Sequence, residues 1–533
     1  MMKKSFLRLY SVESFSLKLS TFNPHELSRV VLRAVRENKD DLSFWKSVVA
    51  RANAIADQFQ PYDISVIAYG LGRMRYRDKD LLTKLAARAI PSLSSMSLSD
   101  ISHLLAGFAR VDVRNDLLFD LASREIGKKI NTCKSLVEIS NIIFSFVSLN
   151  YEHPLLFSAL GKRAMFLLPF TQTCASSEIC KLVESFARSE IQDDRLFALF
   201  SSEICRRIDQ MSALGIAGIA SAYAKRDLLN KSIFLTELLL DESFKRRSEF
   251  DAVSASLLLS AVVDAKAKSK ISLIAEYFIS DFCRRGVMKF DLVSISLLAS
   301  ALGKYHVNSA LTSPTADETK LFMSIGDRVA SLSDQLDHQM IAMLVKAFAD
   351  VGVRHGPFLF NIPNHVREMI GEMSLSEIGM VFKGYAYFGI RNDVLLDHVP
   401  PRVLELISST NQGLLPTKDI FALYTKQMGS DGLKNASSAV DILESLAILM
   451  VSDKRLADSL MVYLDGNKSL LSRSELLEKL PQCINTLRPK CPESLLRFIV
   501  ETSSDIDNSI SLSDSARENL EELISQNQQL IVS

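Results

Sequence analysis

Glycine and proline are scarce in this chain of 533 residues. It contains 20 glycines and 14 prolines, well below the usual shares of ~7% and ~5%. β-Sandwiches, barrels and propellers need many turn residues, so the shortage argues against all three and favours helices. Hydrophobic residues make up 47% of the chain and charged residues 23%, which is typical of a soluble protein with a packed core. At roughly 150 residues per domain, the length predicts three or four domains.

Cysteines are few and scattered. The chain has seven, an odd number, and no Cys-x-x-Cys motif. This pattern argues against a disulfide framework and against a zinc site, and it favours a reducing compartment. We expect the thiols to be buried as small apolar groups.

The chain has neither a charge bias nor a long apolar run. Its 62 Lys and Arg balance 62 Asp and Glu, so no overall field attracts nucleic acid or an anionic membrane. Any site for a polyanion must therefore come from local clustering of cations. No apolar run approaches the ~18 residues of a membrane span, so membrane insertion is not expected.

Signatures of catalysis are missing as well. The sequence has no GxxxxGK phosphate loop, and Gly70-Leu71-Gly72 lies inside a helical pattern rather than after a strand. The eight histidines form no HExxH motif and no cluster with cysteine. Adjacent acidic residues are more often solvated surfaces than catalytic pairs. We therefore expect no enzyme activity, no cofactor and no metal site.

The first 23 residues have the composition of a mitochondrial transit peptide. Residues 1–23 carry four basic residues against one acidic residue, together with serines and large apolar residues. A basic, serine-rich segment that can form an amphipathic helix is typical of such addresses. The run Arg8-Leu9-Tyr10-Ser11 resembles the site of the matrix processing peptidase, which would cut after Tyr10. The alternative is a frayed N-terminal tail.

One helical motif recurs along the chain. Taking Ile101 as position 0, apolar residues follow at +3, +4, +7 and +8, which form one face of an α-helix. The starts are spaced by 37, 38, 40, 37, 39, 40, 46 and 37 residues, and weaker copies begin at Leu27 and Ile420. The nine clear copies start at Ile64, Ile101, Ile139, Ile179, Ile216, Ala255, Ile295, Ile341 and Ile378.

Each repeat has room for two helices. A hairpin this small cannot bury its apolar face alone, so neighbouring hairpins must stack. The sequence therefore predicts an all-α fold, an α-solenoid of about ten hairpins over residues 24–429, with a repeat of about 37–40 residues. Small residues at +8 would let adjacent helices approach closely. Residues 430–533 keep helical patterning and are interpreted as a cap of degenerate repeats.

Basic residues keep a fixed phase within the repeat. Positions +9 and +13 are basic in 10 of 18 cases. Because equivalent positions align when the repeats stack, these residues predict one or two positive stripes. Such stripes suit the phosphates of single-stranded RNA. The alternative is that these cations cap helix carbonyls and offset the helix dipole. The ten candidate RNA-binding residues are Arg73, Arg77, Arg110, Arg114, Arg188, Lys225, Lys268, Lys304, Arg354 and Arg391.

Aromatic residues occur at two kinds of position. Those at +7, such as Phe108, are flanked by Ile and Leu and are expected in the core. Tyr69, Tyr387 and Phe388 are better candidates for stacking on bases.

The repeat motif resembles those of organellar RNA proteins. Residues 108–115 read Phe-Ala-Arg-Val-Asp-Val-Arg-Asn, and Phe186-Ala187-Arg188 repeats the start of this pattern. The motif is similar to the heptatricopeptide and octotricopeptide repeats of apicomplexan mitochondrial proteins and to FAST-kinase-like RNA proteins. It is also similar to the helical-repeat subunits of the trypanosome RNA-editing substrate-binding complex. The resemblance covers roughly residues 24–429.

The resemblance implies a mitochondrial matrix protein that binds single-stranded messenger or ribosomal RNA and acts in RNA processing, stability, or the assembly of a ribosome or RNA-editing complex. Many relatives end in a small α/β module with nuclease-like features, and residues 430–533 lack its alternating strands. We therefore expect no RNA cleavage. Other ribonucleoprotein subunits are expected partners. The alternative is a protein scaffold within a mitochondrial ribonucleoprotein, without direct contact to RNA.

Overall fold

The architecture is taken from a computed structural model. It describes residues 19–39, 41–170, 175–189, 191, 193–309, 311, 313–412, 421–451, 453–504 and 513–527. All regular secondary structure in these ranges is helical, which confirms the predicted all-α class.

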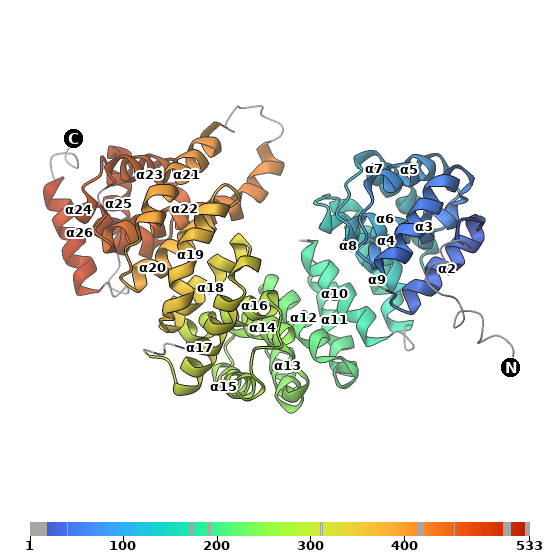
Figure 1. Ribbon diagram of the computed structural model, residues 1–533, viewed down its shortest axis with the longest axis horizontal. Helices are drawn as coiled ribbons and strands as arrows, with labels where there is room; N and C mark the ends of the chain where they lie inside the picture. The colour runs from blue at the N-terminus through green and yellow to red at the C-terminus, as the bar shows by residue number, and fades with distance from the viewer. Residues whose placement is uncertain are drawn as a thin grey trace. The chain divides into compact units, whose positions relative to one another are not determined.

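The helices form hairpins that stack in two compact units, Met1–Arg246 and Arg247–Ser533 (Figure 1). We call the first helix of each hairpin the A helix and the second the B helix. In unit 1 the A helices are α2 (Pro24–Arg36), α4 (Pro61–Arg73), α6 (Leu98–Arg110), α8 (Leu136–Ser148), α10 (Ser176–Arg188) and α12 (Ala213–Lys225). The B helices are α3 (Leu42–Ile55), α5 (Lys79–Ala89), α7 (Asp116–Lys129), α9 (Pro154–Leu167), α11 (Asp194–Arg207) and α13 (Ile233–Lys245).

Unit 2 is built in the same way. Its A helices are α14 (Ala252–Val262), α16 (Leu292–Asn308), α18 (His338–Val351), α20 (Leu375–Tyr387), α22 (Phe421–Ile448), α24 (Leu480–Leu487) and the last helix, α26 (Asp514–Gln526). Its B helices are α15 (Lys268–Arg285), α17 (Ala316–Ser331), α19 (Gly356–Met369), α21 (Asp393–Gln412), α23 (Lys454–Gly466) and α25 (Glu493–Ser504). A short π-helical turn, η9 (Glu475–Lys479), precedes α24.

The stacking of hairpins confirms the predicted α-solenoid. The predicted boundaries at residues 23 and 429 stay predictions. Residues 1–18, which include most of the proposed transit peptide, lie outside the described residues, and α22 continues from Phe421 to Ile448.

The start and end of each A helix follow from its local sequence. Several begin with a capping box, in which the N-cap and the third helical residue satisfy each other's backbone N–H, as in Ser97 and Asp100 of α6. After most A helices the residue at +11 adopts a left-handed conformation, with φ of 52° at Asp112 and 79° at Gly352. The next N–H then returns to the carbonyl at +7, as from Val113 to Phe108. This turn fixes position +9 at the C-terminal end of the A helix.

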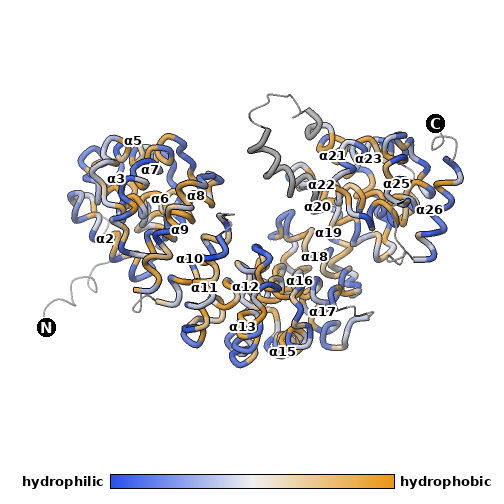
Figure 2. The backbone as a smooth tube through the Cα atoms, turned by 180° about the vertical axis from the view of Figure 1, so that it is seen from behind, coloured by the Kyte–Doolittle hydropathy of each residue, from blue (hydrophilic) through white to orange (hydrophobic). Residues whose placement is uncertain are grey.

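The repeated apolar residues form the core. Positions 0, +3, +4 and +7 of α6 are all fully buried, and the +7 aromatic residues are among the largest buried side chains, which confirms the prediction for Phe108 and its equivalents. Figure 2 shows hydrophobic and hydrophilic stretches alternating along the helices, as expected when one face of each helix is buried.

Small residues let the A helices approach closely. A Cβ added at Gly107 of α6 would lie 2.3 Å from the carbonyl oxygen of Ala68 in α4, and one at Gly72 would lie 2.7 Å from the backbone of Gly107. The predicted close approach at +8 is thus confirmed for this pair. A helices pack on one another more extensively than B helices do, so within each unit the A layer lies on the inner side of the curve.

Candidate nucleic-acid interface

Each A helix has a second face, opposite its core positions, on which some residues are buried, such as Val66 of α4 and Ala106 of α6. At 100° per residue, positions +2, +5 and +9 point away from the buried positions 0, +3, +4 and +7. We call the surface formed by these three positions the A face. Because successive A helices pack side by side, equivalent residues of the A face follow one another along each unit.

The A face of unit 1 carries cations without ion pairs. Among the clear repeats of unit 1, four A helices end in a basic residue at +9 and α8 ends in Ser148, and the weaker repeat of α2 also ends in a basic residue, Arg36. None of the four forms an ion pair within the described part of the chain, and three of them are exposed. We call them the A-face cations: Arg73, Arg110, Arg188 and Lys225.

Arg110 is held between aromatic rings of its two neighbouring A helices. Its guanidinium carbon lies 5.2 Å from the ring centre of Tyr69 in α4 and 5.8 Å from that of Phe144 in α8. Tyr69 also contacts His103 of α6, with 4.7 Å between ring centres. One guanidinium nitrogen of Arg110 is buried without a hydrogen-bond partner among the described residues. The sequence singled out Tyr69 for stacking, but only the structure brings His103 to Tyr69 and Phe144 to Arg110.

The titration behaviour of this cluster follows from its partial burial. Burial lowers the pKa of Arg110, Tyr69 opposes that shift, and the charge of Arg73 adds to it. Burial also lowers the pKa of His103, although two neighbouring acids act in the opposite direction. Arg110 stays charged because a guanidinium does not lose its proton in proteins, whereas His103 is neutral near pH 7. The cluster therefore offers one cation and three flat rings on a single surface.

Further along the A face, a carboxylate lies among three cations. Glu184 of α10 has its pKa raised by burial, and the charges of Arg188, Lys181 and Lys225 oppose this shift. A Cβ at Gly218 of α12 would lie 2.0 Å from a carboxylate oxygen of Glu184, so the glycine makes room for this side chain against α12. Sequence reasoning missed Glu184, at +5, because it considered charged residues at +9 and +13 alone.

The +13 cations of unit 1 contact the protein itself. Arg77 donates to the carbonyl oxygen of Asp112 at 3.0 Å, which links its turn to the left-handed turn of the next hairpin. Arg114 pairs with Asp116 at 2.7 Å and lies 4.5 Å from the ring centre of Tyr151. Both side chains are thus engaged within the protein, through a turn carbonyl and a carboxylate, and do not form an open stripe at +13.

In unit 2 the candidate cations divide into two groups. Lys268 donates to the carbonyl oxygen of Val263 at 2.9 Å. Lys304 pairs with Asp264 of the preceding repeat at 3.0 Å. Arg354 and Arg391 are exposed and form no ion pair or hydrogen bond with the described residues.

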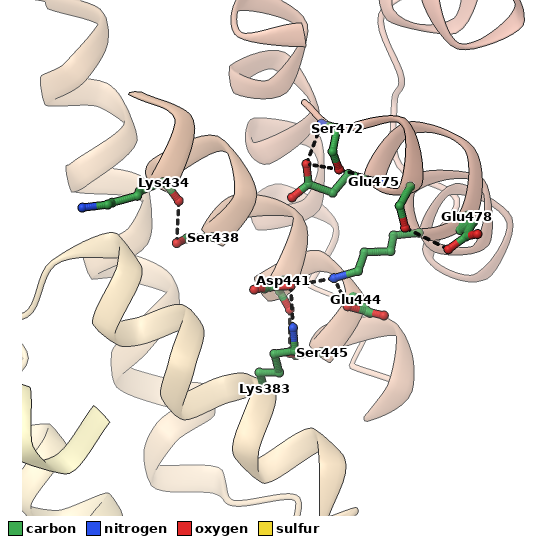
Figure 3. A network of polar contacts seen from close by, with 11 residues as sticks. Lys383, Lys434, Ser438, Asp441, Glu444, Ser445, Ser472, Glu475 and Glu478 are labelled. Atoms are coloured by element: carbon green, nitrogen blue, oxygen red, sulfur yellow. Dashed lines mark hydrogen bonds and ion pairs between the residues drawn. The ribbon is translucent and has the colours of Figure 1, made fainter. Parts of the chain in front are cut away.

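Other charges on the A side of unit 2 are also paired. Lys383 of α20 and Lys479 of η9 both contact Asp441 of α22, at 3.2 and 2.8 Å, and Lys479 also contacts Glu444 at 2.9 Å (Figure 3). Burial by itself would lower the pKa of Lys479, but the hydrogen bonds to Asp441 and Glu444 outweigh it and raise the pKa. Two cations and two acids therefore neutralise one another.

A cavity of about 480 Å³ opens beside this network. Among its lining residues are two lysines, Lys346 and Lys434, and two acids, Asp441 and Glu475. Glu475 accepts hydrogen bonds from Ser472 (Figure 3). The cavity therefore has no excess of either charge, in contrast to the A face of unit 1.

Removing Lys479 should destabilise unit 2. In the Lys479→Ala variant, Asp441 and Glu444 remain half-buried with less compensation, and we expect a loss of about 2 kcal/mol in the free energy of unfolding. The matched control is Lys383→Ala, which leaves Asp441 paired and should cost less than about 1 kcal/mol. Urea unfolding of both variants measures the difference, and equal losses would contradict a central role for Lys479.

The neutral chain consists of two oppositely charged units. Residues 1–246 contain 34 Lys and Arg and 27 Asp and Glu, a net charge of +7, and residues 247–533 contain 28 and 35, a net charge of −7. The whole chain is neutral, which argued against an overall electrostatic field, but its first unit is basic. Unit 1 combines this excess with unpaired cations on its A face.

The described residues hold no other type of candidate site. Among them, no group of His, Cys, Asp or Glu is arranged to hold a metal ion. None of their helices combines the length and apolar character needed to cross a membrane.

Comparison with known proteins gives one family match. The family model described as RNA-editing substrate-binding complex 6 protein matches residues 11–270 and 305–414, which together make up more than half of the chain. No curated protein matches the sequence.

Three structures align over most of the chain with low sequence identity. The first is a homology model of the full-length AP-3 complex in an intermediate open conformation, with 12% identity, coverage of 98% of this chain and 90% of that chain, and a TM-score of 0.33. The pentatricopeptide repeat protein PPR10 in complex with an 18-nt psaJ RNA element has 13% identity, coverage of 98% and 95%, and a TM-score of 0.20. PPR10 from maize has 10% identity, coverage of 98% and 99%, and a TM-score of 0.21.

Proposed function

This chain belongs to the RNA-editing substrate-binding complex 6 protein family, and from that premise we propose that the A face of unit 1 binds single-stranded RNA without catalysing a reaction. The observation that carries the proposal is the set of unpaired A-face cations on a unit of net charge +7. Cations repeated along a stack can contact successive phosphates of an extended strand. Single-stranded mitochondrial RNA in the matrix is the ligand we propose, in keeping with the transit-like residues 1–23.

The Tyr69, Arg110 and Phe144 cluster supports a strand rather than a duplex. Unpaired bases can stack on exposed rings and on a guanidinium plane, whereas the bases of a duplex are already stacked. In this proposal Arg73, Arg188 and Lys225 contact phosphates, and Arg110 contributes both charge and a stacking surface. Arg354 and Arg391 remain candidates for additional contacts in unit 2. The other four candidate cations are assigned to contacts within the protein.

The test is the salt dependence of RNA binding. Anisotropy of a fluorescent 20-nucleotide oligouridine, titrated with the full chain between 50 and 300 mM salt, gives the affinity at each salt concentration. For single strands the slope of log K against log salt falls by roughly 0.7 for each neutralised phosphate, so four contacts give a slope near −2.8. Absence of binding at 50 mM salt, or a flat salt dependence, would contradict the proposal.

Glu184 should weaken RNA binding because it places a negative charge among the cations. In the Glu184→Gln variant the affinity is expected to rise by about fourfold at 0.15 M salt, the effect of roughly one phosphate contact. The pKa of Glu184 is raised, so its carboxyl group takes up a proton at higher pH than an ordinary glutamate. The wild-type affinity should therefore increase as the pH falls from 7 to 5, more than that of the variant.

The matched control for this prediction is Glu237→Gln, which removes one acid from the exposed surface of α13. It should change neither the affinity nor its pH dependence by more than twofold. If both variants strengthen binding equally, the effect reports the net charge of unit 1 and not the position of Glu184.

The second candidate function is that of a protein scaffold within the same complex. The observation in its favour is unit 2, where the net charge is −7 and Lys304, Lys383 and Lys479 are already paired. A chain that acts only as a scaffold would co-purify with its partners after ribonuclease treatment and would not bind the oligouridine. If the chain both binds oligouridine and keeps its protein partners after ribonuclease treatment, we would assign RNA to unit 1 and the partners to other surfaces.

A further inference from the structure

The outer surface of unit 1 carries a row of exposed apolar side chains. Each lies at the second residue of a B helix: Leu117 in α7, Leu155 in α9 and Phe234 in α13, with exposed fractions of 58%, 86% and 73%. The equivalent residue of α11 is Arg195. Because α7, α9, α11 and α13 pack consecutively, these residues follow one another across four helices.

A second apolar row lies one turn further along the same helices. Leu199 of α11 is 37% exposed, and Leu121 of α7 and Leu238 of α13 are half-buried. Ile233, beside Phe234, is also exposed. Single exposed apolar residues are common on soluble proteins, but apolar residues at equivalent positions of neighbouring helices, here interrupted by Arg195, form a patch of the kind that binds a partner. We call this patch the outer strip.

The charges around the outer strip are opposite in sign to those of the unit that carries it. Four acids border it, Asp116, Asp120, Asp194 and Glu237, while Arg195 is the cation within it. Asp116 and Asp120 pair with neighbouring arginines. Asp194 and Glu237 are exposed and form no ion pair with the described residues. Counting Arg114, Arg124 and Arg195 against the four acids leaves a net charge of −1 here on a unit of net charge +7, and the two unpaired acids favour a basic ligand.

We infer that the outer strip binds a basic amphipathic helix of another protein. Neighbouring packed helices are ~8–10 Å apart, and two turns of an α-helix rise about 10.5 Å, so a helix lying across the B helices would place one apolar residue on each at a spacing of seven. Crossing from α7 to α13 takes three such steps, which requires roughly 20 residues. Lys and Arg beside the apolar residues of this helix would meet the acidic border.

This surface lies on the B helices, whereas the RNA proposed above lies on the A helices. The inference therefore does not depend on the proposed function, and both ligands can bind at once. It predicts that variants of the outer strip separate partner binding from RNA binding.

The test uses site-specific photo-crosslinking in cells. The full chain carries p-benzoylphenylalanine in place of Leu155 or, as a control, in place of Lys162, an exposed residue of the same helix α9. Sequencing of the crosslinked peptide is expected to identify, at position 155 only, a segment with apolar residues at helical spacing and an excess of Lys and Arg. An acidic or non-helical segment, a peptide of this chain itself, a crosslink to RNA, or equal crosslinking at both positions would overturn the inference.

A double variant provides the quantitative measurement. Leu155→Asp with Phe234→Asp should weaken binding of the identified peptide at least tenfold and leave oligouridine binding within twofold of the wild type. Both side chains are exposed, so an unchanged thermal transition is expected and shows that the variant is folded. Wild-type affinity for the peptide in this variant would overturn the inference, as would a parallel loss of RNA binding.

Discussion

Removing the four A-face cations together is expected to weaken the binding of single-stranded RNA about 200-fold at 0.15 M salt, because each lost phosphate contact removes roughly 0.7 from the slope of log K against log salt. The variant replaces all four with alanine. The slope should become shallower by about 2.8, and the affinity at 1 M salt, where counterion release contributes little, should change far less. Anisotropy titrations with oligouridine over the same salt range measure both quantities.

The matched control removes four charges from unit 1 without touching the A face. Lysines at positions 46, 79, 162 and 231 are exposed and lie on B helices or in turns. Their replacement by alanine lowers the charge of the unit from +7 to +3, as the A-face variant does. If RNA responds only to net charge, the two variants lose affinity equally, and the assignment of the A face is wrong.

The fold could be predicted from sequence because one physical rule repeats along the chain. A helix that buries positions 0, +3, +4 and +7 in every copy needs a neighbour on each side, so periodicity alone predicts stacked hairpins. The same periodicity continues through position 246, where the chain divides into two units. Periodicity reports the contact of each hairpin with its neighbours and carries no signal for where the stack divides.

The candidate site was predictable only in part, because the role of a cation depends on what lies beside it. The pairing of Lys304 with Asp264 joins two +9 positions of adjacent repeats, so comparing each +9 residue with its predecessor would have predicted it. The hydrogen bond from Arg77 to the carbonyl of Asp112 depends on a left-handed turn in the next hairpin, and no side-chain pattern encodes it. Phe144 was missed because Tyr69 was the one +5 residue that the sequence analysis considered.

Adding a methyl group at Gly107 is expected to destabilise unit 1 by about 3 kcal/mol, the upper part of the range for overpacking. The added Cβ in Gly107→Ala would lie 2.3 Å from the carbonyl oxygen and 2.4 Å from the carbonyl carbon of Ala68. These are backbone atoms, so no side chain can rotate away, and α4 and α6 must separate. For a unit of this size, such a loss lowers the transition temperature by roughly 6–12 °C.

The matched control is Gly127→Ala in α7. Nothing lies within 4 Å of a Cβ at this position, and alanine is the better helix former by about 1 kcal/mol, so this variant should be slightly more stable than the wild type. Differential scanning calorimetry of both variants distinguishes the steric effect from the effect of helix propensity. If propensity dominated, both variants would have higher transition temperatures than the wild type. A stabilised Gly107→Ala protein would show that α4 and α6 do not pack as closely as described.

The same substitution tests whether helix spacing sets the geometry of the A face. Gly107 lies three residues before Arg110, whose guanidinium lies between Tyr69 of α4 and Phe144 of α8. Separating α4 from α6 would pull Arg110 away from Tyr69 without removing any cation. If stacking contributes to binding, Gly107→Ala should lower the affinity for oligouridine at temperatures where the protein is still folded, with an unchanged salt slope. An unchanged affinity would show that RNA binding depends on the charges of the A face and not on stacking.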